Sequence, residues 1–254
     1  MNMSKIKLIA AASAACLALS SCKFFNYKGE DGAVYDGSQP SDLRVTVDFE
    51  VENFDEITVE GSFNIIYVAG EPSASVTIAD NKVNEIIVKT SNNHLTIKPA
   101  YKKARLGKVD IVVSSPMLND LEIAGACSFK TDATIYSQGF DATVAGAGKL
   151  YIGNLQSDGD VDCNIAGAGR FEFGTVRCKD FDAQIAGSGK IDVGDIVCES
   201  CDLGIAGSGN ISIIGNAKED CEVYISGSGR IDMSRLSIAG KYSQKISGSG
   251  KIIR

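Results

Sequence analysis

The chain has 254 residues, of which 44% are hydrophobic and 22% charged, a composition that excludes a disordered or collagen-like protein and suffices for one large core. The formal charge of −7 argues against a nucleic-acid-binding protein, because phosphate recognition depends on clustered Lys and Arg. One His, no Trp and 27 Gly disfavour His-based catalysis and favour tight backbone turns, so we expect no enzyme.

Residues 1–21 have the organisation of a bacterial export signal. Two Lys precede an apolar run over residues 8–19, and this run is too short to be a stable membrane span. We therefore expect residues 1–21 to be removed on export.

The export signal ends in Leu-Ser-Ser-Cys at residues 19–22, which resembles the lipobox of bacterial lipoproteins. The resemblance implies cleavage before Cys22, a lipid on its thiol and attachment to a membrane, since several acyl chains anchor a protein stably. An ordinary secreted protein is the alternative. Lys23 stands where an inner-membrane retention signal would have Asp, which favours an outer-membrane lipoprotein on either the periplasmic or the cell-surface face.

The rest of the chain divides into a tether and a folded part. Residues 22–42 mix Gly, Asp, Ser and one Pro without hydrophobic periodicity, which predicts a flexible tether. Residues 43–254 form the predicted domain, with irregular coils over 43–118 and regular repeats over 119–254. A separate N-terminal β domain over 43–118 is the alternative. Within that segment we expect a turn at Asn92-Asn93 and strands near residues 65–68, 76–78, 86–88, 95–97 and 109–113.

The second half of the chain repeats a five-residue motif, [Ile/Val]-[Ala/Ser]-Gly-[Ala/Ser]-Gly, every 20 or 21 residues. Hydrophobicity alternates with period two on both sides of each motif, as strands require. Short strands in a unit of this length predict an all-β fold, a single-chain right-handed parallel β-helix. The seven motifs begin at Ile123, Val144, Ile165, Ile185, Ile205, Ile225 and Ile246.

Equivalent positions of the coils should stack into columns. From the second motif onward, the residues four before and six after each motif start are apolar, which predicts two inward columns. The small residues and Gly of the motif predict a sharp corner with positive φ. Cys127 replaces the last Gly of the first motif, so we expect that corner to be distorted. Val59-Glu-Gly-Ser-Phe63 echoes the motif 64 residues upstream of Ile123, which we interpret as a distance of three coils.

These motifs also carry a family resemblance. The opening at residues 59–63, the passage Pro-Met-Leu-Asn-Asp-Leu-Glu-Ile-Ala-Gly at 116–125 and the Gly-Ser-Gly-[Lys/Arg/Asn]-Ile repeats resemble the putative auto-transporter adhesin, head GIN domain family. The resemblance covers about residues 43–254. It implies a β-helical envelope protein named for adhesion and transfers no ligand or catalytic residue.

Carboxylates recur three and five residues before the motif starts, and these positions point outward from one strand face. Carboxylates stacked at about 4.8 Å repel one another, which raises their pKa values or favours a cation such as Ca²⁺. A basic row five residues after the motif starts is expected to neutralise these carboxylates in part; otherwise the face binds a cation or a basic partner. The basic row consists of Lys149, Arg170, Lys190, Arg230 and Lys251. The candidate acidic face consists of Asp160, Asp162, Asp180, Asp182, Asp202, Asp220 and Glu222, and Asp141 continues it.

The cysteines after Cys22 form equivalent pairs in adjacent coils. Cys178 pairs with Cys198 and Cys201 with Cys221, so each pair should lie within disulfide range. Disulfides, buried thiols and a four-Cys zinc site are the alternatives. Cys127 and Cys163 are out of register, and we expect both to be free and buried.

No residue pattern indicates a catalytic centre. His94 stands alone beside a turn without a nucleophile motif, which favours a surface histidine over a general base. Tyr151 and Tyr224 are the best candidates for stacking on a sugar. The leading hypothesis is a lipid-anchored adhesion module that binds a glycan or an envelope or host protein. A structural assembly factor is the first alternative and a polysaccharide-active enzyme the second.

The last coil ends without a cap at residues 251–254, just after the final Gly-Ser-Gly. Uncapped strand edges pair readily with other strands. The sequence therefore predicts end-to-end self-association or capping by a partner.

Overall fold

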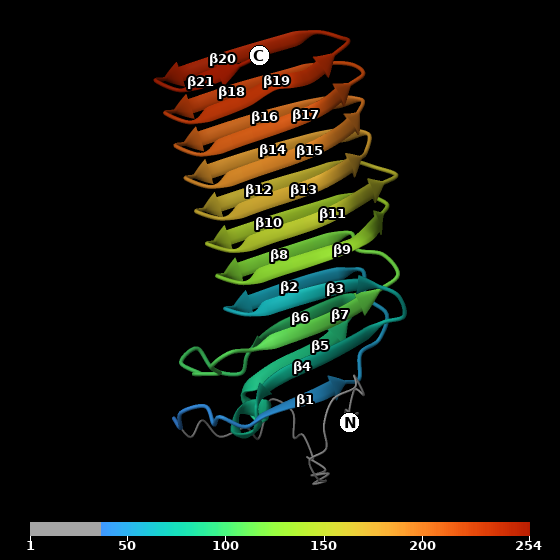
Figure 1. Ribbon diagram of the computed structural model, residues 1–254, viewed down its shortest axis with the longest axis vertical. Helices are drawn as coiled ribbons and strands as arrows, with labels where there is room; N and C mark the ends of the chain where they lie inside the picture. Colours follow the sequence, from blue (N-terminus) through green and yellow to red (C-terminus); the bar gives the residue numbers. More distant parts are fainter. Residues whose placement is uncertain (1–36) are drawn as a thin grey trace.

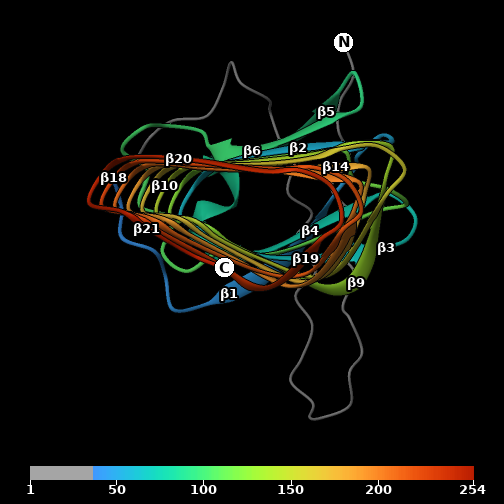
Figure 2. The same ribbon diagram turned by 90° about the horizontal axis from the view of Figure 1, so that it is seen from above.

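The computed structural model describes residues 37–254, which form a stack of coils (Figure 1). One strand of each coil belongs to an 11-stranded sheet, sheet A, and the other to a 10-stranded sheet, sheet B. The sheets enclose one hydrophobic core, and the view along the stack shows a flattened oval (Figure 2). The predicted parallel β-solenoid is confirmed, with two strands in each coil.

From residue 120 onward the coils follow the order of the sequence and pair in parallel. In sheet B these strands are β8 (Asp120–Gly125), β10 (Phe140–Gly146), β12 (Val161–Gly167), β14 (Asp180–Gly187), β16 (Ser200–Gly207), β18 (Cys221–Gly227) and β20 (Tyr242–Gly248). In sheet A they are β9 (Ser128–Ser137), β11 (Lys149–Ser157), β13 (Arg170–Arg177), β15 (Lys190–Cys198), β17 (Asn210–Ala217), β19 (Arg230–Ile238) and β21 (Lys251–Ile253).

The motif forms the corner between the two sheets. Gly187, third in its motif, has φ of 133°, and a Cβ there would collide with the carbonyl oxygen of Gly167 in the preceding coil. Gly189, fifth in the motif, faces the core, where a Cβ would lie 2.6 Å from Cγ2 of Ile165. The first glycine is therefore required by backbone conformation and the second by space.

The corner at Cys127 has the same geometry as the others, so the expected distortion is wrong. Gly125 has φ of 122°, and the amide of Lys149 donates to the Cys127 carbonyl at 2.8 Å, as equivalent residues do in later coils. The Cys127 side chain is accommodated inside, where its sulfur accepts a hydrogen bond from the amide of Phe63 at 3.4 Å.

Both predicted inward columns are confirmed. They are buried along their length except in the last coil, where Tyr242 and Ile252 are partly buried. Because the strands pair in register, equivalent positions of successive coils stack directly on one another. One column consists of Phe140, Val161, Phe181, Cys201, Cys221 and Tyr242. The other consists of Leu150, Phe171, Ile191, Ile211, Ile231 and Ile252.

The N-terminal part contains all five predicted strand regions. The predicted turn joins two of its strands, with φ of 52° at Asn92 and 63° at Asn93. The elements are β1 (Arg44–Phe49), β2 (Glu56–Gly61), β3 (Asn64–Ala69), β4 (Ser73–Ala79), the 3₁₀ helix η1 (Asp80–Glu85), β5 (Ile86–Ser91), β6 (His94–Pro99) and β7 (Asp110–Ser115).

The stacking order of these N-terminal strands differs from their order in the sequence. The coil of β2 and β3 lies between that of β6 and β7 and that of β8 and β9, which Figure 1 shows as blue strands between green ones. Val59 pairs directly with Ile123. The interpretation of their separation as three coils is therefore wrong, because the intervening residues fold back beneath the coil that precedes them.

The N-terminal end of the solenoid is closed by antiparallel strands and a helix. β1, β4 and β7 pair antiparallel in sheet A, and η1 then crosses to β5 in sheet B. Lys82 and Val83 of η1 are buried, and Lys82 Nζ donates to Glu85 Oε1 at 2.7 Å. Side chains of η1 therefore cover this end of the core.

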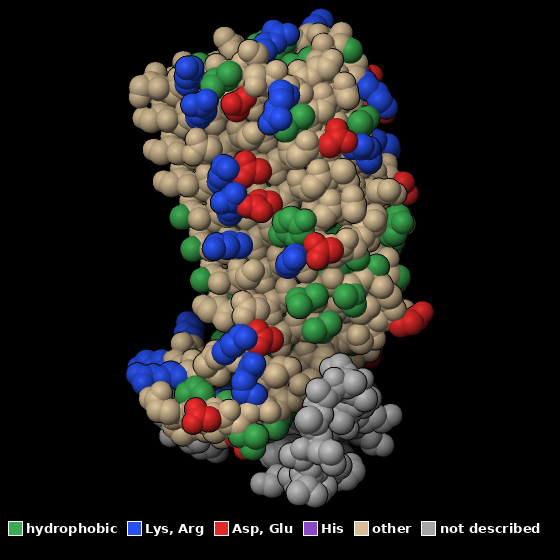
Figure 3. Space-filling view, in the orientation of Figure 1, with side chains coloured by type: hydrophobic (Ala, Val, Ile, Leu, Met, Phe, Trp, Pro, Cys, Tyr) green, Lys and Arg blue, Asp and Glu red, His purple; other side chains and the backbone are tan. Residues whose placement is uncertain are grey.

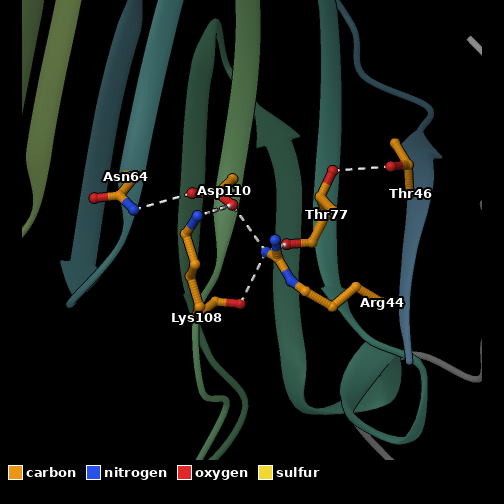
Figure 4. A network of polar contacts seen from close by, with 6 residues as sticks. All are labelled: Arg44, Thr46, Asn64, Thr77, Lys108 and Asp110. Atoms are coloured by element: carbon orange, nitrogen blue, oxygen red, sulfur yellow. Dashed lines mark hydrogen bonds and ion pairs between the residues drawn. The ribbon is translucent and has the colours of Figure 1, made fainter. Parts of the chain in front are cut away.

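A polar network joins the antiparallel strands (Figure 4). The Arg44 guanidinium donates to the Thr77 carbonyl at 2.7 Å and lies 2.9 Å from Asp110. Burial alone would raise the pKa of Asp110, but hydrogen bonds from Asn64, Arg44 and Lys108 lower it. The network holds β1, β4, β7 and β3 together.

Candidate functional site

A row of seven carboxylates crosses the outward face of sheet B, and we call it the acidic row. Each member is the Cα partner of the next one in the neighbouring strand, so consecutive members lie about one strand spacing apart. The row extends two coils further than predicted, to Asp120 and Glu56. These two residues lie three positions before Ile123 and Val59, so the spacing used for the later coils could have identified them. From β2 to β18 it consists of Glu56, Asp120, Asp141, Asp162, Asp182, Asp202 and Glu222.

Repulsion within the acidic row changes its protonation. Burial, followed by the charges of Asp141 and Asp182, raises the pKa of Asp162 to about 6. Burial and neighbouring carboxylates also raise the pKa values of Asp120 and Asp202. In all three carboxyls burial has the largest effect and repulsion by neighbouring carboxylates adds to it, so both favour the protonated form.

The basic row does not neutralise the acidic row, and that expectation is wrong. Within residues 37–254 no Lys or Arg forms an ion pair with the acidic row. Arg170, Lys190 and Arg230 of the basic row instead pair with acids on sheet A, as Lys190 does with Asp192 at 2.7 Å. The reason is the corner, after which the chain enters the opposite sheet and its outward side chains face the other way. Figure 3 shows these mixed charges on sheet A beside a group of apolar side chains.

All seven residues of the predicted acidic face line one hollow of about 400 Å³. Three of them also stabilise the turns between coils. Oδ1 of Asp180 accepts the amide of Ser200 at 3.2 Å, Oδ1 of Asp220 accepts the amide of Lys241 at 2.8 Å, and Asp160 does the same for Asp180 at 3.3 Å. Asp160, Asp180 and Asp220 therefore have a structural role. Of the other four, Glu222 is exposed and Asp162, Asp182 and Asp202 are half-buried, with Oδ1 of Asp202 enclosed.

An aromatic side chain lies beside the acidic row near the C-terminal coils. Tyr224 extends across Gly204, and its hydroxyl donates to Gln184 Oε1. The amide nitrogen of Gln184 in turn donates to Asp182 Oδ1 at 2.7 Å. A Cβ at residue 204 would overlap the Tyr224 ring and the Gln184 amide, so this glycine creates the space for the ring. Sequence reasoning found Tyr224 and missed Gln184 and Gly204.

The two tyrosines proposed for sugar stacking have different surroundings. Lys130 Nζ lies 5.4 Å from the centroid of the Tyr151 ring on sheet A, so a cation already covers that ring. Tyr224 is 41% exposed and borders a second hollow of about 570 Å³, which is lined also by Glu222, Gln244 and Lys245. Of the two, only Tyr224 combines an accessible ring with a concave surface.

His94 extends the acidic row by one position, as the strand partner of Glu56. Its Nδ1 lies 3.0 Å from Glu56 Oε2 and its Nε2 lies 2.8 Å from the Thr58 hydroxyl. Both ring nitrogens of His94 therefore have a polar partner within hydrogen-bond distance. His94 is thus a partnered surface histidine on a strand.

The described residues include six free thiols and no metal-binding cluster. Cys127 and Cys163 are buried, as predicted. In residues 37–254 no three His, Cys, Asp or Glu side chains converge to hold a metal ion, so neither the Ca²⁺ site nor the four-Cys zinc site has a ligand set. Stacked side chains project in parallel, whereas metal ligands must converge on one point.

The predicted export signal, Cys22 and most of the tether lie outside the described residues. Within residues 37–254, no helix has the length and apolar character needed to cross a bilayer. Attachment to a membrane through Cys22 therefore stays a prediction.

Comparisons with known proteins relate the chain to one family. Residues 53–235 and 174–253 match the family model described as "Putative auto-transporter adhesin, head GIN domain". No curated protein matches the chain in sequence.

Solved structures share the fold at low sequence identity. A putative adhesin from Parabacteroides distasonis has a TM-score of 0.71 and 18% identity, over 84% of this chain and 98% of that one. One from Bacteroides fragilis has a TM-score of 0.65 and 24% identity, over 85% and 100%. A protein described as a putative lipid binding protein, also from P. distasonis, has a TM-score of 0.59 and 24% identity, over 85% and 98%.

Proposed function

The chain belongs to the putative auto-transporter adhesin, head GIN domain family, and from this membership we propose that it is a lipid-anchored binding module that recognises a glycan through sheet B and catalyses no reaction. The family is described as one of putative adhesins, which supports a protein of the cell envelope or cell surface. Both sheets are nearly free of long loops, so the ligand would meet a rigid face whose relief consists of the hollows on sheet B.

The aromatic site at Tyr224 is the observation that carries the glycan proposal. A pyranose ring presents C–H groups that pack on an aromatic ring, while its hydroxyls need polar partners at the edge. Tyr224 offers the ring. Burial raises the pKa of its hydroxyl, and the nearby carboxylates of Asp202 and Asp182 raise it further, which places two acids beside the ring. Gln184 and Lys245 add further polar groups on either side.

Charge restricts the kind of glycan. The acidic row contributes a negative potential beside Tyr224, so a glycan with carboxylate or sulfate groups would be repelled. A neutral glycan, or one with amino sugars, meets no such barrier. We therefore propose a neutral or amino-bearing glycan as the ligand.

The test is binding of the purified mature chain to an array of neutral, amino-bearing and acidic glycans. We expect neutral or amino-bearing glycans to be retained and Tyr224→Ala to lower their affinity about tenfold, the loss expected for one aromatic contact of about 1.4 kcal/mol. Tyr151→Ala is the matched control and should bind like the wild type. Retention of acidic glycans alone, or equal binding by Tyr224→Ala, would refute the proposal.

The absence of catalysis is tested on the same ligands. An enzyme acting on polysaccharide would use paired carboxylates, so the double variant Asp182→Asn, Asp202→Asn separates the two hypotheses. We expect no cleavage of any retained glycan by the wild type, and altered binding in the double variant. Cleavage that this variant abolishes would establish an enzyme instead.

The lipid anchor and its location need a separate experiment in cells. We expect an alkyne-labelled fatty acid to be incorporated into the wild type and not into Cys22→Ser, and only the wild type to fractionate with membranes. Protease added to intact cells then reports the face, beside a periplasmic control protein. Clipping of this chain while the control survives supports surface display, and clipping only after permeabilisation places the chain in the periplasm.

A second role, in envelope assembly, is favoured by the last coil. Among the described strands, β21 and β20 are the edge strands at one end of sheets A and B, opposite β1 and β5, and Ile246 is 42% exposed on β20. Outermost strands present unpaired backbone groups that can pair with another chain. We expect light scattering to show association that rises with concentration and weakens in Ile246→Lys. A monomer at high concentration would contradict this role.

A further inference from the structure

Two cysteine side chains meet inside the core between adjacent coils. Cys201 on β16 and Cys221 on β18 are Cα partners in parallel strands, and both point inward. Their sulfur atoms lie 2.7 Å apart. This is well inside the roughly 3.5–4.0 Å at which nonbonded atoms rest in contact, and a strand spacing of about 4.8 Å lies within the Cα separations that disulfides adopt.

One other thiol, Cys198, lies near enough to compete for Cys201, and a fourth thiol, Cys178, neighbours Cys198. Cys198 precedes Cys201 in a Cys-x-x-Cys arrangement and forms a hydrogen bond with it, and Cys178 occupies the position equivalent to Cys198 one coil earlier. The Cys198 thiol, however, also donates toward the Asn216 carbonyl on β17 at 3.9 Å. Of the two equivalent pairs, only Cys201 and Cys221 have both side chains buried, because Cys178 is partly exposed.

We propose that Cys201 and Cys221 form a structural disulfide that joins β16 to β18, while Cys178 and Cys198 stay as thiols. The oxidant is a disulfide, either a small-molecule disulfide or a disulfide-bearing oxidoreductase. One cysteine thiolate attacks a sulfur of that disulfide and releases one thiolate. The second cysteine thiolate then attacks the mixed disulfide and releases the other. Two protein thiols thus become one S–S bond, and one disulfide is reduced to two thiols.

Burial indicates when the bond forms. Cys201 is 3% exposed and Cys221 is 0% exposed, so a disulfide reagent cannot reach them in the folded chain. Hydrogen bonds with Cys198 and Cys221, together with burial, also raise the pKa of Cys201, which leaves little thiolate for exchange. Oxidation therefore accompanies stacking of the coils, and the completed bond is protected from reductants until the chain opens.

The disulfide would reinforce the acidic row at its C-terminal end. Asp202 and Glu222 directly follow the two cysteines and are themselves Cα partners, so two repelling carboxylates lie across the same strand pair. A covalent link behind them would hold these strands together where the surface charges oppose pairing.

The experiment is oxidative refolding of the reduced mature chain in a glutathione redox buffer, with alkylation of remaining thiols and peptide mapping by mass spectrometry. We expect one linked peptide pair that contains Cys201 and Cys221, and alkylated Cys127, Cys163, Cys178 and Cys198. A bond between Cys198 and Cys201 or between Cys178 and Cys198, or alkylation of both Cys201 and Cys221, would overturn the proposal. The outcome does not depend on the membrane anchor, on location or on glycan binding.

Thermal unfolding supplies an independent measurement. Closure of a loop of about 20 residues should raise Tm of the oxidised wild type above that of the reduced form by about 6–12 °C. Cys221→Ser should lose this difference between oxidised and reduced samples, and Cys198→Ser, the matched control, should keep it. Loss of the difference in Cys198→Ser alone would assign the bond to Cys198 and refute the proposal. The wild-type peptide map decides the question even if a serine variant does not fold.

Discussion

Val59 and Ile123 are paired residues of neighbouring strands, β2 and β8, although 64 residues separate them in the sequence. The same offset relates Thr58 to Glu122, whose side chains hydrogen-bond at 3.3 Å. The segment between them adds strands to the opposite side of β2 and β3, so the chain doubles back before the regular stack begins. The order of coils in space therefore differs from the order in which they are synthesised.

This stacking order can be tested by an engineered cross-link. In the double variant Thr58→Cys, Glu122→Cys, we expect an S–S bond, because the two residues are partners on one outward face within disulfide range. The matched control Thr58→Cys, Thr143→Cys places the thiols two strand spacings apart, too far for a bond. Peptide mapping after mild oxidation measures both. A link in the control but not in the test variant would mean that the coils stack differently.

Stability should depend on pH through the acidic row. The pKa of Asp162 is raised in the folded state to about 6, so its contribution to stability is complete below the unfolded pKa of about 3.9 and is lost as pH rises through about 6. We expect Tm to fall by a few degrees between pH 5 and pH 8, the size being limited by solvent screening of this partly exposed group. Scanning calorimetry over that range measures the trend.

The variant Asp162→Asn attributes the pH trend to this residue. It removes the titrating group and relieves repulsion with Asp141 and Asp182, so it should flatten the dependence and raise Tm at pH 8. Asp192→Asn on sheet A, where the carboxylate is paired with Lys190, is the control and should keep the wild-type slope. An unchanged slope in Asp162→Asn would show that other groups cause the trend.

Two glycines should respond differently to alanine. Gly187→Ala places a Cβ against a backbone carbonyl at positive φ, and we expect a loss of about 1–3 kcal/mol in the free energy of unfolding. Gly204→Ala meets only the ends of the Tyr224 and Gln184 side chains, which can rotate away. It should cost less than about 1 kcal/mol yet displace the ring and weaken glycan binding. Denaturant unfolding and glycan titration of both variants measure these effects. Unimpaired binding by Gly204→Ala would mean that glycan recognition does not depend on the position of the Tyr224 ring.

The buried ion pair of η1 should be essential for stability. Side-chain exposure is 0% for Lys82 and 5% for Glu85, so Glu85→Gln leaves a buried ammonium without this carboxylate. We expect a loss of about 3–5 kcal/mol in the free energy of unfolding. Asp192→Asn breaks two solvent-accessible ion pairs, with Lys190 and with Arg170, and should cost less than about 1 kcal/mol for each pair. Equal small losses in the two variants, measured by denaturant unfolding, would mean that η1 does not cover the core as described.

Much of the regular half of the molecule could be predicted from the sequence. A repeat of 20 or 21 residues becomes a spatial repeat when coils pair in register, so the columns at Phe181 and Ile191 and the corner at Gly187 followed from spacing alone. The acidic row followed by the same logic, and its extension to Asp120 and Glu56 required only the same offset.

Only the tertiary structure decided those contacts that the sequence repeat does not predict. A strand such as β2 can pair with any parallel partner of similar pattern, so only long-range hydrogen bonding placed it between β6 and β8 and brought His94 to Glu56. Likewise, spacing put basic and acidic rows close along the chain, but the corner turned them to opposite faces. The sequence determined the coil, because its period is local; the order of the early coils and the charge of each face depended on how distant segments packed.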